Sequence, residues 1–184
     1  MRRYWFPKRY ADTVAKLRVP SGFLLVAAFA YFAVPDTQSL LIGLPVSILG
    51  LLLRAWAAGH LAKNQNLATS GPYSYMRNPL YVGTLMVAAG LVMASRQWLL
   101  AGLFGAVFLF IYLPVIELEE QHLRKLFPKY SAYADEVPML LPFGRLRSSG
   151  VFQSRLYLKN QEYQALAGYL VGLMLLIWKA GLFA

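Results

Sequence analysis

Five apolar segments separated by polar stretches dominate the sequence. They are Val19–Val34, Leu40–Leu61, Leu80–Ala94, Trp98–Ile116 and Ala165–Leu182. A helix that crosses the hydrocarbon needs about 17–25 residues, so the first and third segments must include flanking residues in their helices. Backbone groups inside a bilayer must pair within the segment, and the alternation typical of a membrane barrel is missing from this sequence. The pattern therefore predicts an all-α integral membrane protein with about five transmembrane helices.

The connectors between these segments differ greatly in length. "PDTQS" joins the first two segments and "SRQ" joins the third and fourth, so we expect each of these pairs to form an antiparallel hairpin. The other two connectors are longer and polar, at about 62–79 and 117–164. Any chemistry that uses a water-soluble cofactor is expected in these long connectors.

Composition supports a membrane protein. The 184 residues are 58% hydrophobic and 14% charged, whereas soluble domains are about 25% charged. The absence of cysteine excludes disulfides, thiolate metal sites and cysteine nucleophiles. We expect a single domain over 1–184, with a basic arm at 1–18, a core at 40–143 and an extra C-terminal helix at 165–182. The basic, aromatic start lacks the pattern of a cleaved signal peptide.

The charge of +10 is distributed unevenly along the chain. With five spans, fifteen lysines and arginines share one side, and only Arg96 and Lys179 lie on the other. The positive-inside rule then places the N-terminus, both long connectors and any active site in the cytoplasm, and the C-terminus outside. The basic residues flank apolar blocks and form no recognition motif, so nucleic acid is not expected as a partner.

The first long connector contains the unusual stretch "SGPYSYMRNPLYVG". Gly71 and Pro72 favour unusual backbone angles, and Pro79 suits the first turn of a helix. Arg77 offers a planar fork for a carboxylate or phosphate, and Tyr73 or Tyr75 could face a ligand. The alternative is a rigid interfacial loop whose residues matter only for stability.

The second long connector begins with three of the eight acidic residues, Glu117, Glu119 and Glu120. Helical spacing predicts that Glu117 and Glu120 share a face, with Glu119 pointing elsewhere, and that Glu120 can pair with Arg124. One of the carboxylates could accept two ribose hydroxyls; the alternative is a polar helix extension. Pro114 is expected to kink the fourth helix.

Two tyrosines and the end of the second segment supply further candidates. Tyr130 and Tyr133, three residues apart, could form an aromatic wall for adenine or for a sulfonium cation. Arg54 is predicted to snorkel toward the cytoplasmic interface, and His60 lies on one helical face with Trp56. Only two histidines are present and no paired ligand spacing is seen, so no metal site is predicted.

Taken together, the motifs resemble the isoprenylcysteine carboxyl methyltransferase family, which groups with membrane phospholipid N-methyltransferases. The resemblance rests on "RAWAAGH", "LATSGPYSYMRNPLYVG", "ELEEQHLRKLFPKYSAY" and "VPMLLPF", in that order, and covers about 40–143. It implies an S-adenosylmethionine-dependent enzyme whose cofactor pocket is cytoplasmic and whose lipophilic acceptor arrives from the bilayer. A prenylcysteine-type carboxylate is the favoured acceptor, with an amine headgroup as the alternative.

The resemblance also assigns roles to residues. Catalytic roles fall on Arg77 and Glu120, and substrate contacts on Arg54, Trp56 and His60. The cofactor would be bound by Gly71, Pro72, Tyr73, Asn78, Pro79, Tyr81, Glu119, Glu120, Tyr130 and Tyr133. Where the family has Arg-His-Pro, this chain has Asn78, which keeps hydrogen-bonding capacity but cannot carry a proton. A non-catalytic relative and a nicotinamide-dependent membrane reductase are the competing classes.

Overall fold

Helices are the only regular secondary structure in the described part of the chain. The computed structural model describes residues 5–144 and 150–182, and no strand occurs among them. The helices are α1 (Lys8–Phe32), α2 (Thr37–Ala58), η1 (Gly71–Ser74), α3 (Pro79–Ser95), α4 (Trp98–Val107), η2 (Phe108–Tyr112), α5 (Leu113–Leu126), α6 (Tyr130–Glu136), α7 (Ser154–Lys159) and α8 (Tyr163–Lys179). The predicted all-α class is therefore confirmed. Arg2, Arg3, Arg145 and Arg147, four of the fifteen basic residues counted on one side, lie outside the described residues.

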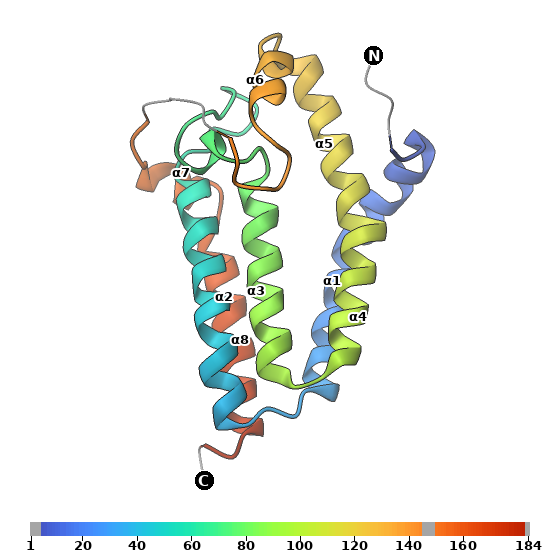
Figure 1. Cartoon of the computed structure of the whole chain (residues 1–184), viewed down its shortest axis with the longest axis vertical. Helices are drawn as coiled ribbons and strands as arrows, with labels where there is room; N and C mark the ends of the chain where they lie inside the picture. The colour runs from blue at the N-terminus through green and yellow to red at the C-terminus, as the bar shows by residue number, and fades with distance from the viewer. Residues whose placement is uncertain (1–4, 145–149, 183–184) are drawn as a thin grey trace.

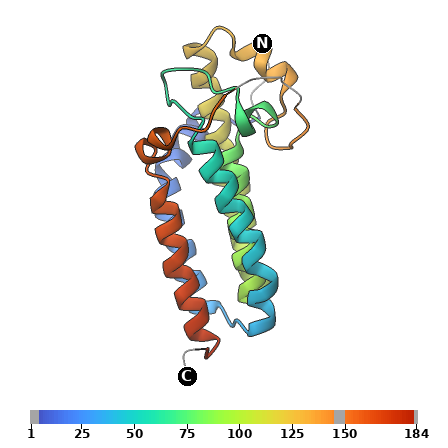
Figure 2. The same cartoon turned by 90° about the vertical axis from the view of Figure 1, so that its left-hand side faces the viewer.

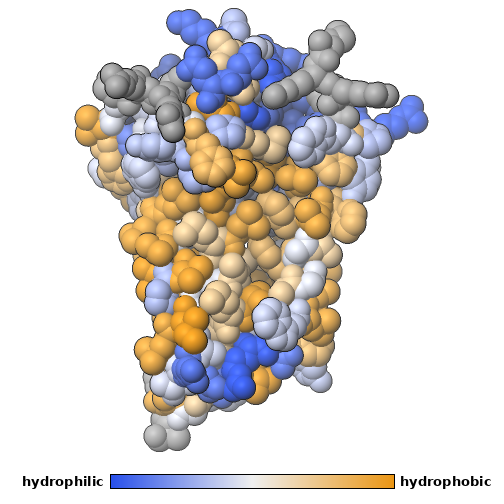
Figure 3. Space-filling model, in the orientation of Figure 1, coloured by the Kyte–Doolittle hydropathy of each residue, from blue (hydrophilic) through white to orange (hydrophobic). Residues whose placement is uncertain are grey.

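Among the described residues, three helices are long and apolar enough to cross a membrane: α1, α2 and the joined helix α4–η2–α5 over Trp98–Leu126. The apolar helices α3 and α8 have 17 residues each, so the prediction of five spans stays a prediction for these two. All of them run between two ends of the molecule, and the start of α1 and the described parts of both long connectors lie at one end (Figure 1). The visible face carries an apolar belt with hydrophilic atoms at both ends, as expected for a bilayer protein (Figure 3).

Helices α2 and α3 form the most closely packed pair and run side by side along their length (Figure 2). Glycines make this approach possible. A Cβ added at Gly43 would lie 2.3 Å from the carbonyl oxygen of Gly90, and one at Gly50 would lie 2.6 Å from that of Gly83. Small residues let two helix backbones come close in this way, and the gain is van der Waals contact.

The two expected hairpins differ in their packing: α3 and α4 contact each other, whereas α1 and α2 do not form one of the substantial helix contacts within the described residues. Helix α1 packs mainly along α4, η2 and α5 rather than along α2, although "PDTQS" joins α1 to α2 directly. A short connector fixes only where two helix ends meet, and the packing of the helix surfaces determines the remaining contacts. Hydrogen bonds and an ion pair nevertheless hold the short connectors in place. Asp36 caps α2 by accepting from the Ser39 amide at 2.7 Å, and it also pairs with Arg96 of the other short connector.

The fourth helix accommodates Pro114 through a π-helical turn, η2, which precedes it in the chain. Proline has no N–H to donate to the carbonyl four residues earlier, which here belongs to Phe110. That carbonyl accepts a hydrogen bond of 2.7 Å from the hydroxyl of Tyr10 in α1. The predicted local distortion is thus a π-turn, and it helps to hold α1 against this helix.

The C-terminal segment returns to the end of α2. Gln153 N–H donates to the Gly59 carbonyl, and the Asn160 side chain donates to the carbonyls of Ala58 and Leu61 at 3.0 and 2.9 Å. These bonds satisfy carbonyls that a helix end leaves free. At the other end of α8, Lys179 Nζ donates to the carbonyls of Ala30 and Tyr31, where α1 ends. The α8 helix is therefore tied to the bundle at both ends.

Candidate active site

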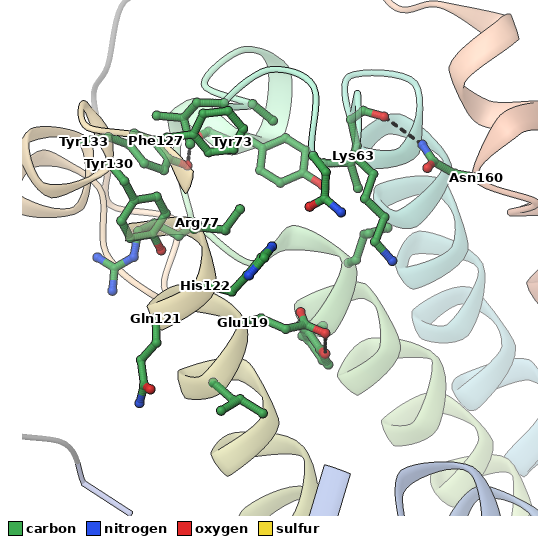
Figure 4. Close-up of a pocket in the computed structure, with 18 of the residues that line it drawn as sticks. Lys63, Tyr73, Arg77, Glu119, Gln121, His122, Phe127, Tyr130, Tyr133 and Asn160 are labelled. Carbon is green, nitrogen blue, oxygen red and sulfur yellow. Dashed lines mark hydrogen bonds between the residues drawn. The ribbon is translucent and has the colours of Figure 1, made fainter. Parts of the chain in front are cut away.

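A cavity of about 900 Å³ lies at the end of the bundle that carries the long connectors (Figure 4). Both long connectors contribute to its wall, as do α1, α2, α3 and the α4–α5 helix. Its apolar wall includes Leu80 and Leu118, and its polar wall includes Asn66, Gln121 and His122. The cavity therefore extends from the polar connectors to the adjacent ends of the helices. A site for a polar cofactor and a lipophilic partner needs both kinds of surface.

The structure brings only part of the predicted site to this cavity. The candidates that line it are Arg54, Tyr73, Arg77, Tyr81, Glu119, Tyr130 and Tyr133. The candidates that do not line it are Trp56, His60, Gly71, Pro72, Asn78, Pro79 and Glu120. The second group surrounds the first and fixes its geometry, as the contacts below show.

Gly71 opens the short helix η1, which carries Tyr73 to the cavity. Its φ of +59° lies in the left-handed region that favours glycine, and an added Cβ would lie 2.7 Å from the His60 ring. His60 in turn shares a hydrogen bond of 3.0 Å between its Nδ1 and the Ser70 hydroxyl. Burial lowers the pKa of His60, which favours the neutral imidazole. These residues form a packed support behind the cavity.

Arg77 and Glu120 form a buried ion pair. Arg77 Nε and Nη2 donate to the two carboxylate oxygens of Glu120 at 2.7 and 3.0 Å, while Nη1 donates to the carbonyls of Ala134 and Val137. Burial lowers the pKa of Arg77, but the hydrogen bonds and charge of Glu120 outweigh it and leave the pKa raised. Every nitrogen of the Arg77 fork has a protein partner. The pair therefore joins α3's entry to α5 and α6, and the fork is not free for a ligand carboxylate.

Asn78 and Pro79 complete this junction. Asn78 Nδ2 donates to Glu120 at 3.0 Å and to the Met139 carbonyl at 3.3 Å. Pro79 is the first residue of α3, as predicted, because a helix start needs no N–H at that position. A charged histidine in place of Asn78 would add a second cation beside Glu120, whereas asparagine gives the same carboxylate a neutral donor.

The three acidic residues of α5 have separate partners. Glu117 accepts from the backbone amides of Trp5 and Phe6 at 2.8 and 3.1 Å, so it holds the N-terminal arm. Glu120 is buried against Arg77, and the predicted Glu120–Arg124 pair is wrong: Arg124 instead lies 5.2 Å from the centroid of the Tyr130 ring. Glu119 alone lines the cavity. It accepts from the Tyr81 hydroxyl at 3.0 Å and is half exposed.

Tyrosines form one wall of the cavity. The rings of Tyr130 and Tyr133 meet edge to face with centroids 5.9 Å apart, and both residues are buried. The Tyr133 hydroxyl donates to the Tyr73 carbonyl at 2.7 Å. The Tyr130 hydroxyl, in a residue that is only 1% exposed, has no hydrogen-bond partner within the described residues. A buried hydroxyl normally has a partner, so this atom fits a ligand that completes the wall.

Of the three predicted substrate contacts, only Arg54 lines the cavity. Arg54 lines the cavity but does not snorkel freely: its Nε pairs with Glu162, and its Nη1 donates to Thr84 and to the Leu80 carbonyl. Trp56 packs against His60 and Tyr75, with ring centroids 6.4 and 6.5 Å apart, away from the cavity wall.

Sequence reasoning missed several residues of the wall. They are Lys8, Arg18, Lys63, His122, Lys125, Asn160 and Glu162. Glu162 is the clearest omission, because a buried acid at the start of an apolar helix requires a partner, and Arg54 was available. Residues 5–144 and 150–182 contain no cluster of three His, Cys, Asp or Glu side chains that could hold a metal ion.

Comparison with known proteins identifies the family. The phospholipid methyltransferase family model matches residues 39–130, which is half of the chain and includes α2, α3 and α5 with the first connector. This protein belongs to the phospholipid methyltransferase family. It is a membrane protein of that family, and the match contains most of the cavity residues described above.

Individual relatives agree with this assignment. The chain is 28% identical over 141 residues to the protein-S-isoprenylcysteine O-methyltransferase of Schizosaccharomyces pombe, covering 73% of this chain and 59% of that protein. It is 34% identical over 105 residues to the cobalt-zinc-cadmium resistance protein CzcN of Cupriavidus metallidurans, covering 54% of this chain and 49% of that protein. The chain thus spans about half the length of the curated relatives it matches. No solved structure matches it significantly.

Proposed function

We propose that this protein transfers a methyl group from S-adenosylmethionine to a lipophilic acceptor bound in the 900 Å³ cavity. The observation that carries the proposal is the combination of a half-exposed carboxylate in the cavity wall, Glu119, with a buried tyrosine wall whose Tyr130 hydroxyl lacks a partner among the described residues. The family match supports methyl transfer as the reaction class. A prenylcysteine-type carboxylate is the favoured acceptor, and an amine headgroup is the alternative.

The cavity residues fit this cofactor in size and chemistry. Ligand sites commonly occupy about 300–1,000 Å³ and combine apolar walls with a few polar groups. Glu119 would accept the ribose hydroxyls, because it is half exposed in the cavity wall, whereas Glu120 is buried and bound by Arg77 and Asn78. The faces of Tyr73, Tyr130 and Tyr133 would attract the positive sulfonium. When bound, S-adenosylmethionine supplies a methyl group on sulfur that is ready for in-line displacement.

The residues of the chain act in this proposal by positioning and by excluding water. The Arg77–Glu120 pair holds the connectors around the cavity, and the tyrosines present a surface of low polarity. A carboxylate acceptor is already ionised at neutral pH and needs no general base. Asn78 cannot act as one. We place the catalytic core at 40–143 and the active site on the cytoplasmic side, in accordance with the distribution of basic residues.

Calorimetry on the detergent-purified protein tests the cofactor assignment. We expect S-adenosylmethionine to bind and NADPH not to bind. Glu119→Gln should weaken binding, while Glu117→Gln, on the same helix but away from the cavity, is the matched control. Binding of NADPH alone would favour the reductase class, and binding of neither would favour a non-catalytic relative.

A methylation assay with membrane lipid extract tests the reaction itself. The protein is supplied with cofactor labelled in its methyl group, and the labelled product is identified by mass spectrometry. We expect a methyl ester of a lipophilic acid; an N-methylated headgroup would select the alternative acceptor. Absence of any labelled lipid, with the cofactor bound, would reject catalysis on lipids.

A further inference from the structure

Arg18 of α1 reaches the carboxylate that the proposed function assigns to the cofactor. Its Nη1 lies 3.3 Å from Glu119 Oε1 and 3.4 Å from the Tyr81 hydroxyl, and all three residues line the cavity. Tyr81 itself donates to Glu119. The three side chains come from α1, α3 and α5, so they connect three helices at one point of the cavity wall.

This point lies at a seam between α1 and α3. Helix α1 packs along α4, η2 and α5, and α1 and α3 do not form one of the substantial helix contacts within the described residues. The cavity nevertheless reaches Lys8 and Arg18 of α1 as well as Leu80 and Thr84 of α3. The side chains of Arg18 and Tyr81 therefore bridge two helices that the backbone packing leaves apart.

Arg18 differs from the other two arginines of the cavity in its free donors. All three nitrogens of Arg77 are used, and Arg54 is bound to Glu162, Thr84 and the Leu80 carbonyl. Arg18 uses only Nη1, through two long contacts, and its Nε and Nη2 form no hydrogen bond within the described residues. Its side chain is 42% exposed, so it can turn without breaking a buried contact.

The charges around the cavity favour an anionic ligand. Its arginines are each paired with a glutamate, as Arg18–Glu119, Arg54–Glu162 and Arg77–Glu120. The remaining charged wall residues are Lys8, Lys63 and Lys125, which form no ion pair within the described residues. A cofactor whose hydroxyls bind Glu119 would compete with Arg18 for this carboxylate, which frees donors of the guanidinium for a second ligand. An acceptor with an anionic oxygen group is stabilised there, whereas one carrying only a cation is repelled.

We infer that Arg18 binds the anionic oxygen group, a carboxylate or a phosphate, of the lipophilic acceptor at the seam between α1 and α3. The inference rests on the proposed function. The guanidinium fork suits either group through two parallel hydrogen bonds. Arg18 lies outside residues 39–130, so this contact is not part of the segment that the family model matches. The alternative is an arginine that merely extends toward the interface, but its Nη1 is directed at Glu119 and Tyr81.

Equilibrium binding of two labelled lipids to the detergent-purified full chain, saturated with S-adenosylmethionine, tests this role. The carboxylate probe is N-acetyl-S-farnesylcysteine, and the phosphate probe is dioleoylphosphatidylethanolamine. The methyl ester of the first probe lacks the anionic group and serves as the neutral comparison. The variants are Arg18→Ala, Arg18→Lys and, as a matched control, Arg9→Ala, an exposed residue of α1 that does not line the cavity.

We expect Arg18→Ala to weaken binding of one anionic probe by roughly tenfold to a hundredfold, the usual effect of a charge-assisted hydrogen bond. Arg18→Lys should lose part of that affinity, and Arg9→Ala none. Binding of the methyl ester should be the same in every variant. The anionic probe that responds identifies the group as carboxylate or phosphate. Thermal unfolding of Arg18→Ala should match wild type, because exposed ion pairs contribute little to stability.

Three results would overturn the inference: neither anionic probe binds, Arg18→Ala binds both as wild type does, or the methyl ester loses affinity equally. Calorimetry with S-adenosylmethionine on the same samples separates this from the proposed function. If the wild-type protein does not bind the cofactor, the proposed function fails. If the cofactor binds normally and Arg18→Ala changes no lipid affinity, only the role of Arg18 fails.

Discussion

Arg77 and Glu120 are joined by two hydrogen bonds of 2.7 and 3.0 Å in a buried ion pair, although 43 residues separate them in the chain. The pair links the entry of α3 to α5, and the remaining nitrogen of Arg77 bonds to the carbonyls of Ala134 and Val137. A single side chain therefore organises both long connectors. Loss of the Arg77–Glu120 pair should therefore lower stability first, whereas loss of the Glu119 carboxylate should lower cofactor affinity.

Glu120→Gln should lower the free energy of unfolding by about 3–5 kcal/mol, because it leaves a buried guanidinium without its counter-charge. Arg77→Lys should also destabilise, since an ammonium cannot reach the same four acceptors. Replacement of both partners by Arg77→Met with Glu120→Leu should cost less than either single change. Thermal unfolding in detergent measures all of them. Wild-type stability of Arg77→Lys with lost activity would instead return Arg77 to direct ligand binding.

Glu119→Gln should behave in the opposite way. Its side chain is half exposed, so the unliganded protein should unfold at the wild-type temperature. Affinity for S-adenosylmethionine should fall by about 10–150-fold, as for loss of a charged hydrogen-bond acceptor. Isothermal calorimetry gives the dissociation constant. A change of less than threefold contradicts the ribose assignment.

Tyr130 and Tyr133 allow a matched comparison, because each can lose its hydroxyl oxygen by substitution with phenylalanine. Tyr133→Phe removes the 2.7 Å hydrogen bond to the Tyr73 carbonyl and should cost about 1 kcal/mol of stability. Tyr130→Phe removes a hydroxyl without a partner in the described residues, so the unliganded protein should lose no stability. Cofactor affinity of Tyr130→Phe should nevertheless fall. If Tyr130→Phe binds the cofactor as tightly as wild type, its hydroxyl does not contact the ligand.

Glycine-to-alanine changes test the α2–α3 contact. Gly90→Ala should be strongly destabilising, because the new Cβ would lie 2.4 Å from the Gly43 carbonyl oxygen. Gly172→Ala, in α8, meets nothing within 4 Å and should be neutral or slightly stabilising. Thermal unfolding of the two variants gives the comparison. Equal stability would mean that α2 and α3 do not approach as closely as described.

Cysteine accessibility tests the orientation cleanly, because the chain has no cysteine of its own. Lys129→Cys should react with an impermeant maleimide only from the cytoplasmic side, and Thr37→Cys only from the outside. Both positions are exposed. The expectation follows from the basic residues at the connector-bearing end. Labelling of position 37 from the cytoplasmic side would show that the chain has the opposite orientation in the membrane.

Much of the framework follows from the sequence alone. The length and apolar character of the segments predict α1, α2, α3, the α4–α5 helix and α8, because a bilayer admits only backbone that is hydrogen-bonded within each segment. The motifs around Arg77 and Glu119 also direct attention to the two long connectors. The structure places their described parts at one end of the bundle (Figure 1), and both line the same cavity.

Tertiary structure alone decided which side chains are free. Sequence could not distinguish Glu119 from Glu120. Consecutive residues of a helix point in different directions, and only the packing of the helix against its neighbours shows which side chain faces the cavity. Nor could the sequence show that Glu120 occupies the fork of Arg77, or that Arg18 from another helix reaches Glu119. These pairings join residues far apart in the chain. They are fixed by the glycine contact of α2 with α3 and by the packing of α1 on α5, which no local pattern encodes.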